Sequence, residues 1–195
     1  MPRIGVSDLH VAILDEKTDI EGGTITYQAP VRLAKLINIG ITKTVGEAEL
    51  YADDSLDEYV AQQTAQEISI NPKDISTEHE ALLLGKRLDS NGGIVSGSND
   101  NAPYCAVMFR SKKSDGTYQY RVLYKVKFRP YDETYDTQSN SITFQTPTIT
   151  GRSMARNTDG NFDYKLDESA DNQAVVGTWF DEPVEPAAEA VTPEG

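Results

Sequence analysis

Cysteine, histidine and tryptophan are scarce in this sequence. The 195 residues include one cysteine, two histidines and one tryptophan. A single cysteine excludes an intrachain disulfide, which is typical of proteins that fold in the cytosol. So few histidine and cysteine side chains leave little material for a metal centre or an activated nucleophile, and no constellation of catalytic residues is recognisable. The sequence therefore predicts a protein that is not an enzyme and that needs no cofactor or metal.

Long apolar runs and positive charge are scarce as well. No stretch approaches the roughly 18 apolar residues of a membrane-spanning helix, and the first eight residues lack the basic and apolar regions of a secretory signal. Acidic residues outnumber basic ones by 31 to 18, which gives a formal net charge of −13. An acidic field of this size is unsuited to binding DNA or anionic lipid. We therefore expect neither membrane contact nor specific DNA binding.

The most regular pattern lies between Tyr104 and Arg129, where two β segments meet at Asp115-Gly116. In the second segment aromatic residues and valine alternate with mostly polar residues, with Leu123 as the exception. Alternation of this kind predicts a strand with one buried and one solvated face, and Asp-Gly predicts a tight hairpin turn. We expect this hairpin, whose second strand would span about 40 Å at roughly 3.3 Å per residue, to form one wall of a sheet.

Shorter patterns predict the remaining elements. Strands are expected over residues 9–14, 24–28, 31–45, 65–70 and 141–150, with a second hairpin at residues 152–166. Thr77 and Glu80 match a helix capping box and Gly85 is a typical helix end, so they predict a short helix. A further short helix is expected within residues 168–180. The fold class is therefore mainly β, a sandwich or barrel with one short flanking helix.

Three segments show neither the alternation of a strand nor the capping residues of a helix. Residues 1–8 are interpreted as an extended arm, and residues 47–63 as a long acidic loop, because their apolar side chains share no face. Residues 181–195 contain five of the acidic residues, no basic residue and no aromatic. Such a composition buries too little surface to offset chain entropy. We expect one domain over residues 1–180, followed by a disordered acidic tail.

The few reactive side chains are expected to be structural. His10 lies on a predicted strand, His79 in the first turn of the predicted helix, and Cys105 in an apolar strand. The oxygen-bearing residues 157–163 lack the glycine and glutamate positions of a calcium-binding loop and predict a turn. A basic row is interpreted as a solvated face or a source of salt bridges between subunits; it consists of Arg121, Lys125, Lys127 and Arg129.

Several short motifs occur in an order that is more informative than any one of them. They are Ile4-Gly5-Val6, Asp8-Leu9-His10 with Ala12, Leu50-Tyr51-Ala52-Asp53-Asp54, Pro103-Tyr104, Tyr124-Lys125-Val126-Lys127-Phe128, and the run at residues 144–151. Over residues 3–180 the chain resembles the major tail proteins, or tail tube proteins, of bacteriophages with long non-contractile tails. The acidic residues 181–195 have no counterpart in that resemblance.

The resemblance implies a structural virion protein with a sandwich-like tail-tube fold, an inter-subunit loop and terminal arms. It implies hexameric rings stacked into a tube around a tape-measure protein, with tail terminator and distal tail proteins at the ends. Such a tube is assembled in the cytoplasm of the bacterial host and conducts DNA without binding it. Contacts between rings are expected at Ile4, Leu50, Tyr51, Asp53, Asp54 and Tyr59, and a polar stripe facing the lumen at Ser141, Thr143 and Gln145.

Two other functions remain open from the residues alone. A tyrosine-rich sheet could bind carbohydrate or a receptor as part of a virion, and a closed barrel could hold a small ligand. Both predict a monomer or small oligomer with a defined pocket, whereas the tube predicts self-assembly. Negative-stain microscopy of the purified chain at high concentration is the observation that separates them.

Overall fold

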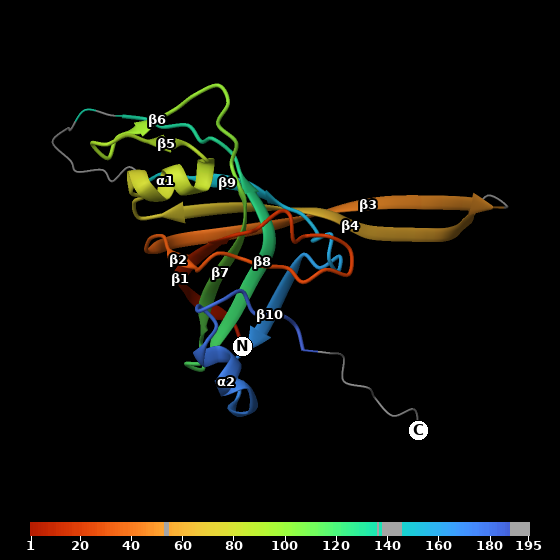
Figure 1. Cartoon of the computed structure of the whole chain (residues 1–195). Coiled ribbons are helices and arrows are strands. Elements are labelled where there is room, and N and C mark those ends of the chain that lie inside the picture. The colour runs from red at the N-terminus through yellow and green to blue at the C-terminus, as the bar shows by residue number, and fades with distance from the viewer. Residues whose placement is uncertain (53–54, 136, 138–145, 188–195) are drawn as a thin grey trace.

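Alternating side chains place most of the chain in one bent antiparallel sheet, which Figure 1 shows in the computed structural model. The structure describes residues 1–52, 55–135, 137 and 146–187. The elements in chain order are β1 (Arg3–Ile13), β2 (Val31–Arg32), β3 (Leu36–Ala52), β4 (Ser55–Pro72), α1 (Thr77–Leu84), β5 (Arg87–Leu88), β6 (Ile94–Val95), β7 (Tyr104–Lys113), β8 (Tyr118–Phe128), β9 (Ile149–Ser153), β10 (Asp163–Asp167), the 3-10 turn η1 (Ala170–Asn172) and α2 (Gln173–Gly177). The predicted mainly β fold class is confirmed.

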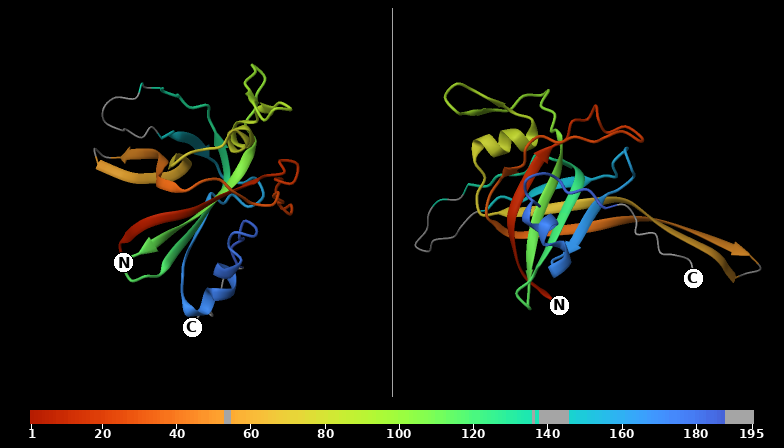
Figure 2. Two further views of the ribbon diagram at one scale, coloured as in Figure 1. Left: turned by 90° about the vertical axis from the view of Figure 1, so that its left-hand side faces the viewer. Right: turned by 60° about the horizontal axis from the view of Figure 1, so that its bottom comes forward.

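The strands of the main sheet run in the order β2-β1-β7-β8-β9-β4-β3, and β10 pairs with β8. The right-hand view in Figure 2 shows β3 and β4 crossing over β1, β7 and β8, and the left-hand view shows the two groups as separate layers, so the sheet folds back on itself. The larger core fills the space between these layers and includes Leu9, Val11, Ile68, Ile70, Leu83, Val107, Leu123 and Phe128. A second core lies on the opposite face of β7 and β8, where Tyr120, Val122 and Tyr124 pack with Trp179 near α2. No helix in the described part of the chain is long and apolar enough to cross a membrane.

The hairpin of β7 and β8 is confirmed, with Gly116 at its turn in the left-handed region (φ 91°). The predicted solvated face is wrong, because both faces of β8 are buried. The register passes from Val107↔Leu123 to Cys105↔Val126, so one extra residue on β8 forms a bulge. Val126 therefore joins Leu123 in the larger core, although the sequence alternation assigns them to opposite faces.

The bulge at Tyr124 and Lys125 is also where the sheet divides. Before it, β8 pairs with β10, and after it β8 pairs with β9. The Tyr124 amide donates to Phe162 O, and Lys125 O accepts from the Met154 amide. The predicted hairpin over residues 152–166 is therefore wrong: its strands, β9 and β10, pair with β8 and not with each other.

The basic row is only partly a solvated face, because Arg121 and Lys125 are largely buried whereas Arg129 is 54% exposed. Arg121 pairs with Asp163, Lys125 with the buried Asp19, and Arg129 with Glu67. Lys127 donates to Asn101. Each of these four basic side chains therefore has an intrachain partner.

Residues 3–8 are not a free arm. They form the first half of β1, which pairs with β7 from Arg3↔Lys113 onward. The register shifts between Ser7 and His10, where Asp8 adopts a φ of 57° and its carboxylate accepts from Arg110 and Arg32. This bulge brings Val6 and Leu9 to the same core although they are three residues apart. Because this bulge interrupts the alternation of apolar and polar residues, the sequence pattern does not predict a strand over residues 3–8.

The helix prediction is confirmed with a different cap. Helix α1 ends at Gly85 (φ 66°), but its N-cap is Ser76, whose hydroxyl accepts from the His79 amide. Two other predicted strands shift: residues 24–28 make only the isolated bridge Leu14↔Tyr27, and the strand expected at 141–150 begins at Ile149 among the described residues. The short helix expected within residues 168–180 is present as α2.

The prediction of a disordered acidic tail is wrong for the described residues 181–187, which dock on the body of the subunit. Pro183 is buried, Val184 packs on the second core, and Val184 O accepts from the Tyr124 hydroxyl at 2.8 Å. Glu185 pairs with Arg156, whose side chain is 1% exposed. The composition of residues 181–195 does not reveal this docking, because the partner of Glu185 is a buried arginine elsewhere in the fold.

Truncation after Phe180 is therefore expected to destabilise the protein. A buried charge that loses its partner costs about 3–5 kcal/mol, and Arg156 keeps Asp159, so we expect the lower end. That corresponds to a fall in Tm of roughly 6–12 °C for a chain of this size. A second truncation, after Ala187, is the matched control and is expected to keep the wild-type Tm. Thermal unfolding of both truncated proteins and the full chain measures the difference. Equal Tm values would show that residues 181–187 contribute nothing.

Candidate assembly surface

A strongly exposed structure in the described part of the chain is the outer half of the β3–β4 hairpin, residues 45–63, which we call the ribbon. Strand β9 pairs with β4 only from Gln66 to Ile70. From Ala65 toward the tip of the hairpin, β3 and β4 therefore pair only with each other among the described strands. The ribbon projects away from the body, at the right of Figure 1. From Val45 its first strand extends about 26 Å at roughly 3.3 Å per residue.

This ribbon corrects the prediction of a loop at residues 47–63. The strands pair in register through Glu47↔Ala61, Ala48↔Val60 and Glu49↔Tyr59. Pattern analysis missed it because burial produces the alternation that identifies a strand, and neither ribbon face is buried in one subunit. The signal present in the sequence was weaker: β-branched and aromatic residues on both sides of a short acidic turn.

Both faces of the ribbon mix apolar and acidic side chains. Alternation along β3 places Val45, Glu47, Glu49 and Tyr51 on one face, together with their cross-strand neighbour Tyr59, and we call this the tyrosine face. The Tyr51 hydroxyl donates to Glu49 at 2.9 Å. The opposite face carries Ala48, Leu50, Glu58 and Val60.

The exposure of these apolar side chains is large. Leu50 is 54% exposed, Tyr51 64%, Tyr59 51% and Val60 51%. The sequence of residues 45–63 contains six acidic residues and no basic residue. An isolated two-stranded ribbon is at best marginally stable in water, and an exposed edge invites pairing with another chain. The geometry is that of a surface to be covered by a partner.

The predicted contact residues do not form one site. Leu50, Tyr51 and Tyr59 lie on the ribbon, whereas Ile4, 64% exposed, lies at the start of β1 on the body. Asp53 and Asp54, and the predicted lumen residues Ser141, Thr143 and Gln145, lie outside the described residues. Sequence reasoning missed Val45 and Val60, which are equally exposed on the ribbon.

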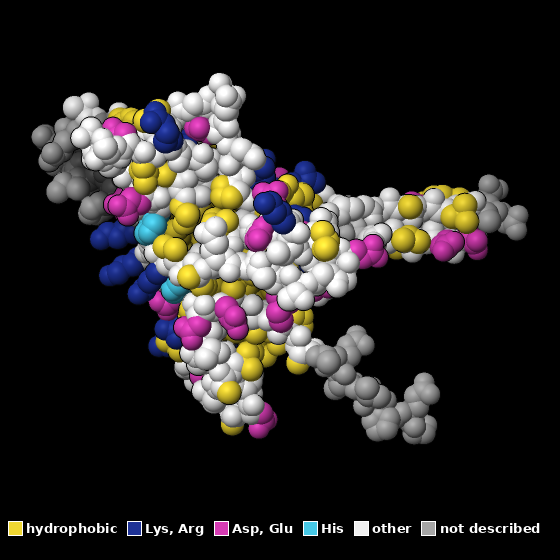
Figure 3. Space-filling model, in the orientation of Figure 1, with side chains coloured by type: hydrophobic (Ala, Val, Ile, Leu, Met, Phe, Trp, Pro, Cys, Tyr) yellow, Lys and Arg dark blue, Asp and Glu magenta, His cyan; other side chains and the backbone are white. Residues whose placement is uncertain are grey.

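Charge is unevenly distributed over the molecule. In Figure 3 acidic and apolar side chains follow the ribbon, while Lys and Arg gather at the opposite end of the view. Lys35 and Lys73 flank that end of the β3–β4 hairpin, where the Lys73 amide donates to Lys35 O at 2.8 Å. One hairpin thus has an acidic end and a basic end.

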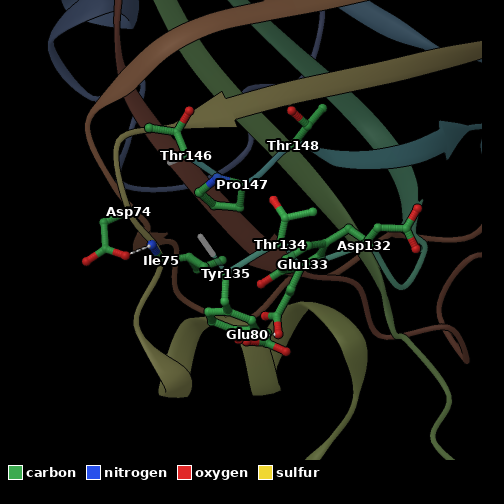
Figure 4. A pocket seen from close by; sticks show the side chains of 11 residues that line it. Asp74, Ile75, Glu80, Asp132, Glu133, Thr134, Tyr135, Thr146, Pro147 and Thr148 are labelled. Atoms are coloured by element: carbon green, nitrogen blue, oxygen red, sulfur yellow. Dashed lines mark hydrogen bonds between the residues drawn. The ribbon is translucent and has the colours of Figure 1, made fainter. Parts of the chain in front are cut away.

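A hollow of about 470 Å³ lies beside α1 and is shown in Figure 4. Its lining includes four carboxylates, from Asp74, Glu80, Asp132 and Glu133. Burial and the neighbouring Glu80 raise the pKa of Tyr131, which keeps this phenol protonated. Within the described residues, His, Cys, Asp and Glu form no cluster of three or more that could hold a metal ion.

The predicted structural roles of the reactive side chains agree with the geometry. His10 Nδ1 lies 3.1 Å from Asp8 O, and its ring stacks on Phe180 at 4.5 Å between centroids. Cys105 is buried, and burial raises the pKa of its thiol far above its usual value. Residues 157–160 form a turn with Gly160 at φ 74°.

The described features thus centre on a surface for association. A comparison with curated proteins finds no match. A family model described as phage tail tube protein matches residues 1–182, which is nearly the whole chain. The chain therefore belongs to the phage tail tube protein family and is a structural component of the tail tube.

Proposed function

We propose that six copies of this chain close into a ring and that the rings stack into the tube through which phage DNA passes. The observation that carries the proposal is the ribbon, whose apolar and acidic side chains are exposed in the single subunit. Covering Leu50, Tyr51, Tyr59 and Val60 by other subunits would remove apolar surface from water. A protein that worked as a monomer would gain nothing from leaving this surface open.

Ring closure is supported by the edges of the sheet. β3 is the last strand of the sheet order, and its outer edge pairs with no strand in the described part of the chain. A neighbouring subunit that extends the sheet there would satisfy those backbone groups and remove an aggregation hazard. A barrel formed from the sheets of all subunits has no free edge.

The conduit role is supported by charge. Six copies at −13 each would carry −78, and duplex DNA carries one negative charge per roughly 1.7 Å. A basic lumen would hold DNA, whereas an acidic or neutral one lets it slide. We propose that Ser141, Thr143 and Gln145 form part of that neutral lining, around a tape-measure protein during assembly in the host cytoplasm. Tail terminator and distal tail proteins would then cap the two ends.

The alternative of a barrel that holds a small ligand is disfavoured by packing. The space between the sheet layers is filled by the larger core, including Ile68, Val107, Leu123 and Phe128. The carbohydrate-binding alternative gains no support from the second core, because Tyr120 and Tyr124 are buried there. Tyrosines on the ribbon remain free to contact protein.

Negative-stain electron microscopy of the purified chain over a range of concentrations tests the proposal. We expect rings with sixfold symmetry in end views and tubes with an open lumen in side views, growing in number with concentration. Mass photometry gives the stoichiometry independently. A chain that stays monomeric at every concentration, alone and with the other tail proteins present, would overturn it.

A further inference from the structure

A second hollow, of about 400 Å³, lies between the start of β1 and the inner half of β3, and we call it the β1–β3 groove. Its apolar lining is contributed by Val6, Ile37, Ile39, Ile41 and Phe109. Phe109 is buried at its floor, while Ile37, at a bulge in β3, is 53% exposed. The groove therefore offers apolar surface that a single subunit leaves partly uncovered.

The rim of this groove is basic. Arg3 and Arg121 line it, and no aspartate or glutamate does. Arg121 is neutralised by Asp163, but Arg3 makes no ion pair among the described residues. Lys43 continues the row of Ile39 and Ile41 along β3, two residues beyond the groove. Two cations, Arg3 and Lys43, thus remain for an acidic partner.

The tyrosine face of the ribbon is complementary to this groove in both respects. Val45, Tyr51 and Tyr59 of the tyrosine face match the apolar lining of the groove, and Glu47 and Glu49 match the cations at its rim. Tyrosine is enriched at protein interfaces because it combines a large apolar ring with a polar tip. Moreover, Ile39, Ile41, Val45 and Tyr51 share one side of β3, so the tyrosine face continues the core-facing row beyond the body.

We propose that the β1–β3 groove receives the tyrosine face of the ribbon from a second copy of this chain. The ribbon cannot reach the groove of its own subunit, since the same strand, β3, lines the groove and then runs away from it (Figure 1). Contact between two different surfaces is head-to-tail, and such contacts propagate into rings or filaments. The inference rests on the proposed tube function and adds the surface that the ribbon contacts.

Site-specific photocrosslinking in assembled tubes tests this contact. The photoreactive residue p-benzoylphenylalanine replaces Tyr59, and isotope-labelled and unlabelled subunits are mixed so that crosslinks between copies are recognised by mass. We expect crosslinks from position 59 to the tryptic peptides 4–17 or 36–43 of another copy. The same replacement at Val60, on the opposite ribbon face, is the matched control and is expected to give no crosslink to those peptides.

A charge exchange gives a second, independent measurement. Arg3→Glu is expected to raise the concentration needed for assembly about tenfold, the size of one close interfacial charge pair. Adding Lys43→Glu, Glu47→Lys and Glu49→Lys to that variant reverses every charge of the proposed contact and is expected to restore most of the loss. Circular dichroism confirms that each variant is folded before assembly is scored.

The outcomes separate the two proposals. Tubes in which position 59 crosslinks to other peptides, such as those around Lys35 and Lys73, would overturn the groove and leave the tube intact. Tubes that are unaffected by Arg3→Glu would also overturn it. Failure of the unsubstituted chain to form tubes would contradict the proposed function itself.

Discussion

Removing the ribbon is expected to abolish tube formation and leave the subunit folded. In this variant Asn-Gly replaces residues 45–64, so that Thr44 and Ala65, which are cross-strand partners, are joined by a tight turn. The larger core contains no residue of the deleted segment, so its packing is retained. We expect a monomer with an unchanged Tm, no tubes in electron micrographs, and a single species in analytical ultracentrifugation.

A variant with only two substitutions separates the loss of side-chain contacts from the loss of the ribbon itself. Tyr51→Ser with Tyr59→Ser keeps the ribbon and removes most of the apolar surface of its tyrosine face, and it is expected to prevent assembly as well. Gln62→Ser, on the opposite face of the ribbon, is the matched control and is expected to assemble normally. Normal tubes from the tyrosine variant would show that the ribbon acts through its backbone edge and not through these side chains.

Asp19→Ala is expected to cause the largest loss of stability, about 3–5 kcal/mol, because it leaves a buried cation without its partner. The Asp19 side chain is 2% exposed and pairs with Lys125, whose side chain is 10% exposed. It also accepts from the Asn157 amide at 2.7 Å and from the Thr158 amide at 3.1 Å. Urea unfolding at pH 7 measures the loss. Glu16→Ala, an exposed neighbour, is the control and is expected to stay within about 0.5 kcal/mol of wild type.

The pH dependence gives this prediction a sign. Burial alone would raise the pKa of Asp19, but hydrogen bonds from Lys125 and Thr158 outweigh burial and hold that pKa below its usual value. A carboxyl with a depressed pKa in the folded state stabilises the protein above its unfolded pKa of about 3.9, and that stability is lost as the pH falls through the folded value. The difference between wild type and Asp19→Ala should therefore shrink in acid. An equal difference at pH 7 and pH 3 would contradict the ion-pair explanation.

Several properties of this protein were determined by the sequence alone. The hairpin at residues 104–129, the helix ending at Gly85 and the mainly β class follow from alternation, turn residues and caps, which act over a few neighbouring residues. The family followed from the order of short motifs, and the family model agrees with it. The acidic balance, on which the proposed passage of DNA depends, is a matter of composition.

Other properties were decided only by tertiary structure. The faces of β8 depend on a bulge whose extra residue is set by pairing with β7, and the docking of Glu185 depends on Arg156, 29 residues earlier. The ribbon was hidden for a related reason. Alternation of apolar and polar residues identifies a strand only when one of its faces is buried. Residues 45–63 bury neither face within one subunit, so the surface that would cover them belongs to another molecule.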